Sequence, residues 1–206
     1  MSQLTNTRII APPVEEEVYP YRHVWRSVSI QIVVMITISI IFIVFDQFLG
    51  IRLGQTVNFI VTLGFAILPT ILWVAFSVIP ERFVDQPRQH LMSLAIISGL
   101  AAAAIGLPLV RDFYQLEQWI ALQSAVDRIL GYTFTAGIID TGLKFFVLRY
   151  LVFPKGIRTR TDAVAFCMAC AIGYTSVINL DVILTIRPTL TIATLYILGT
   201  YAMQVI

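Results

Sequence analysis

The sequence predicts an all-α, polytopic membrane protein of about six transmembrane helices, and three observations carry this prediction. Hydrophobic residues make up 58% of the 206 residues, charged residues make up only 13%, and the mean hydropathy is +0.84. A soluble domain is nearer half apolar and a quarter charged, and disordered chains are polar and rich in charge. The composition therefore excludes a water-soluble globule and a disordered chain, and leaves a helical membrane protein.

Six stretches are long and apolar enough to cross the hydrocarbon core, which takes about 20 residues of helix. By residue number they are 28–49, 56–79, 91–110, 129–153, 163–186 and 189–206. The fourth stretch carries Asp140 and Lys144, and the fifth carries Asn179 and Asp181. Polar groups therefore concentrate in the second half of the predicted membrane domain.

The first 26 residues lack the features of a signal peptide, because glutamates fill positions 15–17 where an apolar core would be needed. Residues 19–26 combine aromatic and basic side chains, which suit the headgroup region of a bilayer. We expect residues 1–26 to form a cytoplasmic tail and interfacial segment. Residues 27–206 would then form one six-helix transmembrane domain.

The distribution of Lys and Arg predicts the orientation. With the N-terminus in the cytoplasm, nine of these residues lie in inside segments and four in outside segments. Positive charge accumulates in the cytoplasmic loops of membrane proteins. The bias predicts a cytoplasmic N-terminus and, after six crossings, a cytoplasmic C-terminus.

The charge and the cysteines point to no further chemistry. The net charge of +2 is small and the basic residues are scattered, so a nucleic-acid partner is not indicated. Cys167 and Cys170 lack a second pair of metal ligands nearby, and we interpret them as small buried packing residues. Ser98, Ala102 and Gly106 are spaced by four, which predicts close packing of two membrane helices.

Asp140 and Lys144 form a pair of opposite charges predicted to lie in the middle of a membrane span. An ionisable group there costs several kcal/mol, which makes it a functional candidate. The two side chains are four residues apart and share a helix face, so they either neutralise each other as an ion pair or leave Asp140 as an acid, base or ligand. On the next span Thr175, Ser176 and Asn179 share a face, which helix–helix hydrogen bonding explains.

Two features are expected near the outer membrane surface. Asp181 lies near the outer end of its span, where we expect it to be interfacial or paired with Arg187. The segment 111–128 mixes aromatic and aliphatic residues with charges and glutamines, which predicts a short amphipathic helix on the outer interface.

Several short sequence blocks occur along the chain in the order that is typical of one protease family. They are Ala66-Ile-Leu-Pro69 with Trp73, the charged loop Glu81–Arg88, the small-residue run Ser98–Ala102, the block Asp140–Lys144 and the block Gly173–Asn179. Over roughly residues 60–206 they resemble the PrsW family of glutamic or metal-dependent intramembrane proteases, which belongs to the larger group that contains CAAX-type prenyl-protein proteases. The resemblance implies a PrsW-like helical bundle.

The resemblance is incomplete at the family's catalytic positions. Lys144 and Asn179 match, and Asp140 stands where the family has its first glutamate, whereas the second glutamate, the glutamate of the next motif and the histidine are replaced by Thr141, Ile178 and Thr191. Peptide hydrolysis needs a base to activate water, and a metal site needs about three protein ligands. The matched residues are therefore expected to be inactive, unless Asp162 or Asp181 turned toward Asp140 to rebuild a carboxylate pair.

We therefore expect a non-catalytic PrsW-like integral membrane protein that serves as an accessory or scaffold subunit of a larger complex in a bacterial cytoplasmic membrane. Its partners would be the lipid bilayer and other integral membrane subunits. No cofactor or metal is predicted, although lipids or an embedded pigment could bind its outer faces. The alternative is an active PrsW-type protease with a remodelled site that uses Asp140. A carrier is disfavoured, because the six spans show no inverted repeat.

Overall fold

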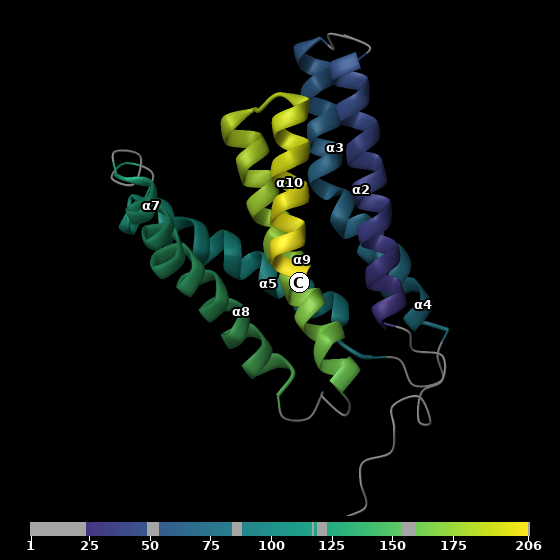
Figure 1. The fold of residues 1–206 in the computed structure, drawn as a ribbon. Helices are drawn as coiled ribbons and strands as arrows, with labels where there is room; N and C mark the ends of the chain where they lie inside the picture. Colours follow the sequence, from purple (N-terminus) through teal and green to yellow (C-terminus); the bar gives the residue numbers. More distant parts are fainter. Residues whose placement is uncertain are drawn as a thin grey trace, which may run out of the picture.

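The computed structural model describes residues 24–48, 54–83, 88–116, 118, 123–153 and 160–205. Within these ranges the chain is all-helical and contains no strand (Figure 1), as predicted. Four helices are long and apolar enough to cross a membrane. They are Val24–Phe45, Gln55–Glu81, Leu91–Phe113 and Thr161–Ile186.

The remaining two predicted spans are helical but do not belong to these four. The predicted fourth span lies in α7 (Ala125–Tyr132), a π-helical stretch (Thr133–Gly137) and α8 (Ile138–Leu151), and the charges along it set it apart from the apolar helices. The predicted sixth span corresponds to α10 (Leu190–Val205), which has 16 residues. Length and composition support four spans, and six crossings stay a prediction.

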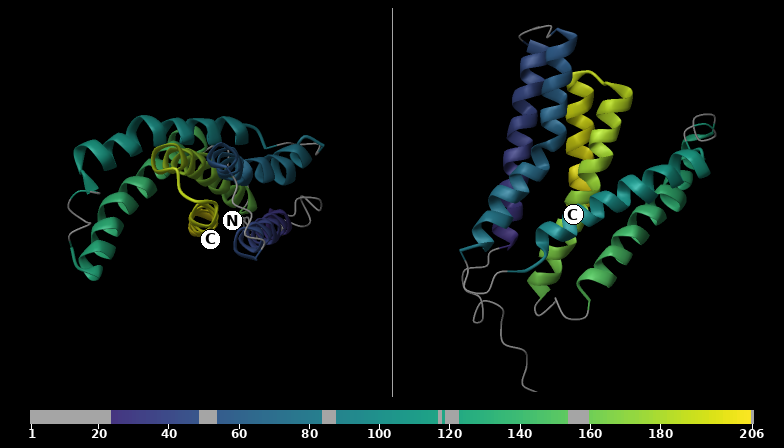
Figure 2. Two further views of the ribbon diagram at one scale, coloured as in Figure 1. Left: turned by 90° about the horizontal axis from the view of Figure 1, so that it is seen from above. Right: turned by 180° about the vertical axis from the view of Figure 1, so that it is seen from behind.

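Four helical rods lie side by side in the body of the molecule (Figures 1 and 2). They are α2 (Val24–Phe48), α3 (Gln55–Trp73) with its continuation through the π-helical stretch Val74–Val78 into α4 (Ile79–Glu81), α9 (Arg160–Ile186) and α10. Helix α9 is central, because α2, α3, α5, α8 and α10 all contact it. The core accordingly gathers around α9 and includes the fully buried side chains of Trp73, Ile172 and Ile183.

Helix α5 (Leu91–Ala101) crosses α9 at unusually close range. A Cβ on Gly173 would lie 2.0 Å from the Ala95 carbonyl oxygen, and one on Gly99 would lie 3.1 Å from the Gly173 oxygen. The two backbones therefore touch, which only small residues permit. Ser98, Ala102 and Gly106 are all buried, in agreement with the packing predicted from their spacing.

The chain continues from α5 through two π-helical stretches, Ala102–Gly106 and Leu109–Phe113. It then returns as α7 and α8, and this returning helix tilts away from the body (Figures 1 and 2). We call residues 125–151 the arm. No described side chain of the arm is fully buried, but Val147 and Leu148 pack against the core, while Phe145, Phe146 and Tyr150 are exposed.

Two predicted segments lie partly outside the described residues. Helix α2 begins at Val24, inside the predicted tail 1–26, and residues 1–23 are not among those described. The predicted interfacial helix 111–128 is described only in part, because residues 117 and 119–122 also fall outside.

Candidate functional site

Asp140 and Lys144 form an ion pair on the inner side of the arm. The Lys144 Nζ lies 2.8 Å from Asp140 Oδ1, and it donates to Oδ2 at 3.1 Å. The side chains keep 23% and 16% of their exposure, respectively. The ion-pair interpretation therefore matches the geometry, although Asp140 stays partly accessible.

Helices α9 and α5 provide the surroundings of this pair. Lys144 Nζ lies over the Tyr174 ring, 5.0 Å from its centre, an arrangement in which the ring electrons stabilise the cation. Cys170 Sγ lies 3.7 Å from the Lys144 carbonyl oxygen and 3.2 Å from Ser98 Oγ, and Ser98 donates to the Cys170 carbonyl at 2.7 Å. These contacts join the arm to α9 and α5.

Of the two cysteines, Cys170 is buried, as predicted, whereas Cys167 is exposed. Cys170 is covered by Ser98 of α5 and by the Lys144 backbone of α8, whereas Cys167, one turn earlier on α9, stays exposed. The interpretation of Cys167 as a buried packing residue is therefore wrong.

Asn179 is fully buried, but it turns toward α10 and not toward Asp140. Its Oδ1 accepts a hydrogen bond of 2.9 Å from Thr200 Oγ1. Its neighbour Ser176 hydrogen-bonds Thr70 on α3, while Thr175 Oγ1 has no hydrogen-bond partner in the described part of the chain. The polar face of α9 thus joins α3 and α10, and the structure does not bring Asn179 together with the ion pair.

Asp181 pairs with Arg111, not with Arg187. Arg111 Nη1 donates to Asp181 Oδ1 at 2.7 Å, and the contact joins α9 to the π-helical stretch that leads to the arm. Arg187 instead lies over the Phe59 ring, 5.5 Å from its centre. The predicted pairing of Asp181 with Arg187 is therefore wrong, because a long-range partner takes its carboxylate.

Asp162 belongs to a second, buried cluster at the end of the body where α9 and α5 begin and α4 ends. Arg88 Nε donates to Asp162 Oδ1 at 2.5 Å, and Arg88 Nη1 lies 3.2 Å from Glu81 Oε2. The Arg88 backbone N–H adds a bond of 2.8 Å to Glu81 Oε1. All three side chains are at least nine-tenths buried. Asp162 and Asp181 are thus both paired with arginines away from Asp140.

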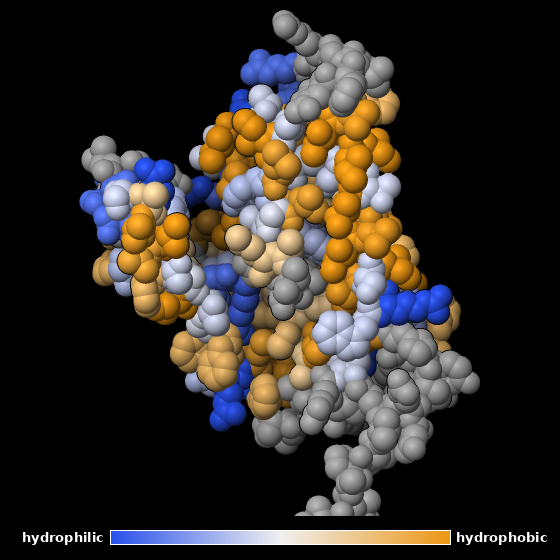
Figure 3. Space-filling view, in the orientation of Figure 1, coloured by the Kyte–Doolittle hydropathy of each residue, from blue (hydrophilic) through white to orange (hydrophobic). Residues whose placement is uncertain are grey.

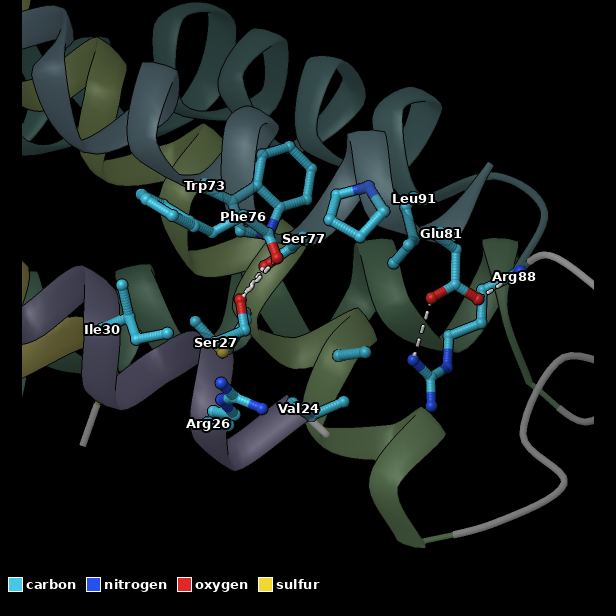
Figure 4. A pocket seen from close by; sticks show the side chains of 13 residues that line it. Val24, Arg26, Ser27, Ile30, Trp73, Phe76, Ser77, Glu81, Arg88 and Leu91 are labelled. Atoms are coloured by element: carbon cyan, nitrogen blue, oxygen red, sulfur yellow. Dashed lines mark hydrogen bonds and ion pairs between the residues drawn. The ribbon is translucent and has the colours of Figure 1, made fainter. Parts of the chain in front are cut away.

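Glu81 and Arg88 of this cluster line a cavity of about 330 Å³ (Figure 4). The cavity also contains Ser27 of α2 and Ser77 of the π-helical stretch. Pro80 has no N–H to donate to the Phe76 carbonyl four residues earlier, and Ser27 Oγ donates to that oxygen at 2.8 Å. The local backbone thus fixes the serine at the cavity wall.

A buried glutamine completes the hydrogen bonding behind the serines. Gln31 Nε2 lies 3.0 Å from both Ser27 Oγ and Ser77 Oγ, and Tyr201 donates to Gln31 Oε1 at 3.2 Å. The network joins α2, the π-helical stretch and α10. Sequence reasoning missed it, and the signal that was present is Gln31 itself, an amide near the start of a mostly apolar span.

Among the described residues, no three His, Cys, Asp or Glu side chains gather closely enough to hold a metal ion. Ion pairs among the described residues join Asp140 to Lys144, Arg111 to Asp181, and Arg88 to Glu81 and Asp162. Comparisons with protein-family models, curated proteins and solved structures find no match to this chain.

Proposed function

We propose that this chain is a non-catalytic integral membrane protein with a degenerate PrsW-like six-helix bundle, and that it serves as an accessory or scaffold subunit of a larger membrane complex. The Asp140–Lys144 ion pair carries the proposal. Asp140 supplies the carboxylate at the matched catalytic positions, and its charge is neutralised 2.8 Å away on its own helix. Pairing is the usual way in which such charges are tolerated in a membrane.

The second matched residue supports the same assignment. Asn179 is fully buried, and its Oδ1 is bonded to Thr200 of α10. This contact joins two helices of the body, so the asparagine serves packing between helices. Residues at positions that a protease would use for hydrolysis thus stabilise the bundle.

The arm is the surface that we assign to the partner subunit. Phe145, Phe146 and Tyr150 on α8 are 59%, 56% and 81% exposed, and the first two of these rings contact each other, as do the last two. Figure 3 shows the molecule hollowed between the arm and the body, with hydrophilic residues along the hollow. A membrane helix with one polar and one aromatic side suits contact with another subunit, because aromatic side chains are enriched in protein interfaces.

The proposed setting is a bacterial cytoplasmic membrane that the chain crosses several times, with the N-terminus in the cytoplasm. The four long apolar helices support a membrane location, and the excess of Lys and Arg in alternate loops supports the orientation. Lipids or an embedded pigment would bind on the outer apolar faces.

Native purification tests the proposal. We expect the chain, extracted with its surrounding lipid, to have a particle mass well above its own 23.1 kDa and to retain a defined second protein. Replacing Phe145 and Phe146 together by alanine should release that protein. Replacing Ile60 by alanine should not, because Ile60 is a similarly exposed residue on α3 (61%). A particle that contains one chain and lipid alone would contradict the proposal.

The competing function is an intramembrane protease that uses Asp140, and one observation favours it. Asp140 keeps 23% of its side-chain exposure, so water can reach it. The test is cleavage of a membrane-anchored substrate by the reconstituted protein. Activity that disappears in Asp140→Asn would support the protease, whereas cleavage that persists in this variant would eliminate the mechanism.

A further inference from the structure

The cavity where α4 ends and α9 begins is lined by the guanidinium group of Arg88, which has one N–H donor that its neighbouring carboxylates do not use. Arg88 donates a hydrogen bond from Nε to Asp162, and it donates from Nη1 and from its backbone N–H to Glu81. Its side chain is only 5% exposed, and its Nη2 is buried without a hydrogen-bond partner in the described ranges. A buried charged donor left unpaired costs more than a neutral one, so an acceptor that reached Nη2 would gain a charge-assisted bond.

The rest of the cavity is mostly apolar. Its lining includes Val24, Ile30, Trp73, Phe76, Leu91 and Met168, with Ala165 on α9. Ser27 and Ser77 also line it, but their hydroxyl groups are engaged with Gln31 and the Phe76 carbonyl. The volume of about 330 Å³ lies at the lower end of the range for ligand sites, about 300–1,000 Å³. The occupant must therefore combine a hydrogen-bond acceptor with an apolar body.

Arg26 adds a positive charge at the cavity. It is exposed and lines the cavity together with Arg88, and unlike Arg88 it lies outside the Glu81–Arg88–Asp162 cluster. An incoming anion would meet Arg26, which is exposed, before Arg88, which is buried; Figure 4 shows both side chains among those that line the cavity. Arginine is well suited to phosphate oxygens, because its planar group offers several donors in a fixed arrangement.

The position of the cavity in the fold restricts the class of ligand further. It lies at one end of three of the long apolar helices, those that begin at Val24 and Leu91 and end at Glu81. If these helices span a bilayer, as the proposed function requires, the cavity lies at the depth of the lipid headgroups. We propose that it binds one phospholipid, with a phosphate oxygen accepting from Arg88 Nη2 and the start of an acyl chain against Trp73 and Leu91.

The experiment measures lipid binding by the full chain after delipidation in detergent. The probe is dioleoylphosphatidylglycerol, followed by native mass spectrometry and by titration. Dioleoylglycerol, which lacks the phosphate, and inorganic phosphate, which lacks the chains, are the comparison ligands. We expect one phosphatidylglycerol to bind per chain, at least about tenfold more tightly than dioleoylglycerol or inorganic phosphate. Dioleoylglycerol lacks the charge-assisted hydrogen bond and inorganic phosphate lacks the apolar contact, and the loss of either interaction should weaken binding by about this factor.

Two variants and one control locate the binding. Ala165→Phe places a ring at the α9 side of the cavity and leaves the three charged side chains unchanged, and Arg88→Lys keeps the charge but removes Nη2. Each should weaken lipid binding about tenfold or more. Ala163→Phe, on the same helix but outside the lining, should bind as the unchanged protein does. The melting temperature will report whether Arg88→Lys folds. If it does not, lipid binding by Ala165→Phe still tests whether the lipid occupies the cavity.

Three results would overturn the proposal. Equal affinity for dioleoylglycerol would reduce the site to an apolar groove, and equal affinity for inorganic phosphate would make it a site for the free ion. Unchanged lipid binding by Ala165→Phe would place the lipid elsewhere. Because the proposed subunit role depends on the arm and on particle mass, lipid binding can fail while the partner subunit is retained, and the two failures are distinguishable.

Discussion

Asp140 and Lys144 depend on each other because each is the other's nearest counter-charge. Their ion pair at 2.8 Å keeps at most 23% of either side chain exposed. Removing one partner leaves a charge at a partly buried site, whereas replacing both by apolar residues removes the charge altogether.

We therefore predict that Asp140→Leu or Lys144→Leu alone lowers stability by up to about 3 kcal/mol, and that the double variant is less destabilised than either. Thermal unfolding in detergent provides the measurement. Strictly additive losses would show that the two side chains do not interact.

Asp162 should be more critical than Asp140, because its side chain is only 4% exposed. We predict that Asp162→Asn costs about 3 kcal/mol or more, since Arg88 would then lose a buried counter-charge. The control is Asp112→Asn, at an exposed position, which should change the melting temperature little. Similar shifts in the two variants would contradict a buried pair.

Residue-level prediction from sequence succeeded where partners are close along the chain. The Asp140–Lys144 pair follows from a spacing of four on one helix. Arg88 and Asp162 are 74 positions apart, and Asp181 and Arg111 are 70 apart, so no local rule connects them. The nearby Arg187 was the natural but wrong choice for Asp181.

At the scale of elements, the contact between α5 and α9 stands out because two backbones meet directly. The Cβ of an alanine at position 173 would lie 2.0 Å from the Ala95 carbonyl oxygen. Backbone cannot rotate away as a side chain can, so the two helices would have to separate.

We predict that Gly173→Ala destabilises the protein by about 3 kcal/mol, at the upper end for overpacking. Gly64→Ala is the matched control, because a Cβ there meets nothing within 4 Å and alanine favours a helix. Thermal unfolding of the two variants gives the comparison. A Gly173→Ala protein as stable as Gly64→Ala would show that the helices are not in backbone contact.

The spacing of Ser98, Ala102 and Gly106 predicted that α5 packs closely, but not against which helix. The four long apolar helices were likewise predictable from composition, since a run of about 20 apolar residues reads directly from sequence. The tilt of the arm was not, because it depends on contacts between helices far apart in the chain. The cavity was missed for the same reason, since α2, α4, α5 and α9 all contribute to it.

At the scale of the whole molecule, the Arg111–Asp181 pair is placed to hold the arm against the body. Arg111 lies in the π-helical stretch Leu109–Phe113, before the arm begins, and Asp181 belongs to the central helix α9. In the part of the chain that the structure describes, contacts around Lys144 join the arm itself to α9. The angle of the arm should therefore respond to this pair.

We predict that Arg111→Gln broadens the distances between spin labels at position 138 of the arm and position 192 of α10, both exposed. Arg149→Gln, an exposed change at the other end of the arm, is the control and should leave the distances unchanged. Pulsed electron paramagnetic resonance of the two variants in nanodiscs measures these distances. Unaltered distances in Arg111→Gln would show that the helix contacts alone fix the arm.

The bond between Tyr201 and Gln31 has a consequence for biosynthesis. The two residues are 170 positions apart, so α2 leaves the ribosome long before its partner in α10 exists. Until then the amide oxygen of Gln31 has no tyrosine to accept from, and an unsatisfied polar group in hydrocarbon is costly. Nascent α2 should therefore stay near the translocon until α10 has been made and its tyrosine can bond Gln31.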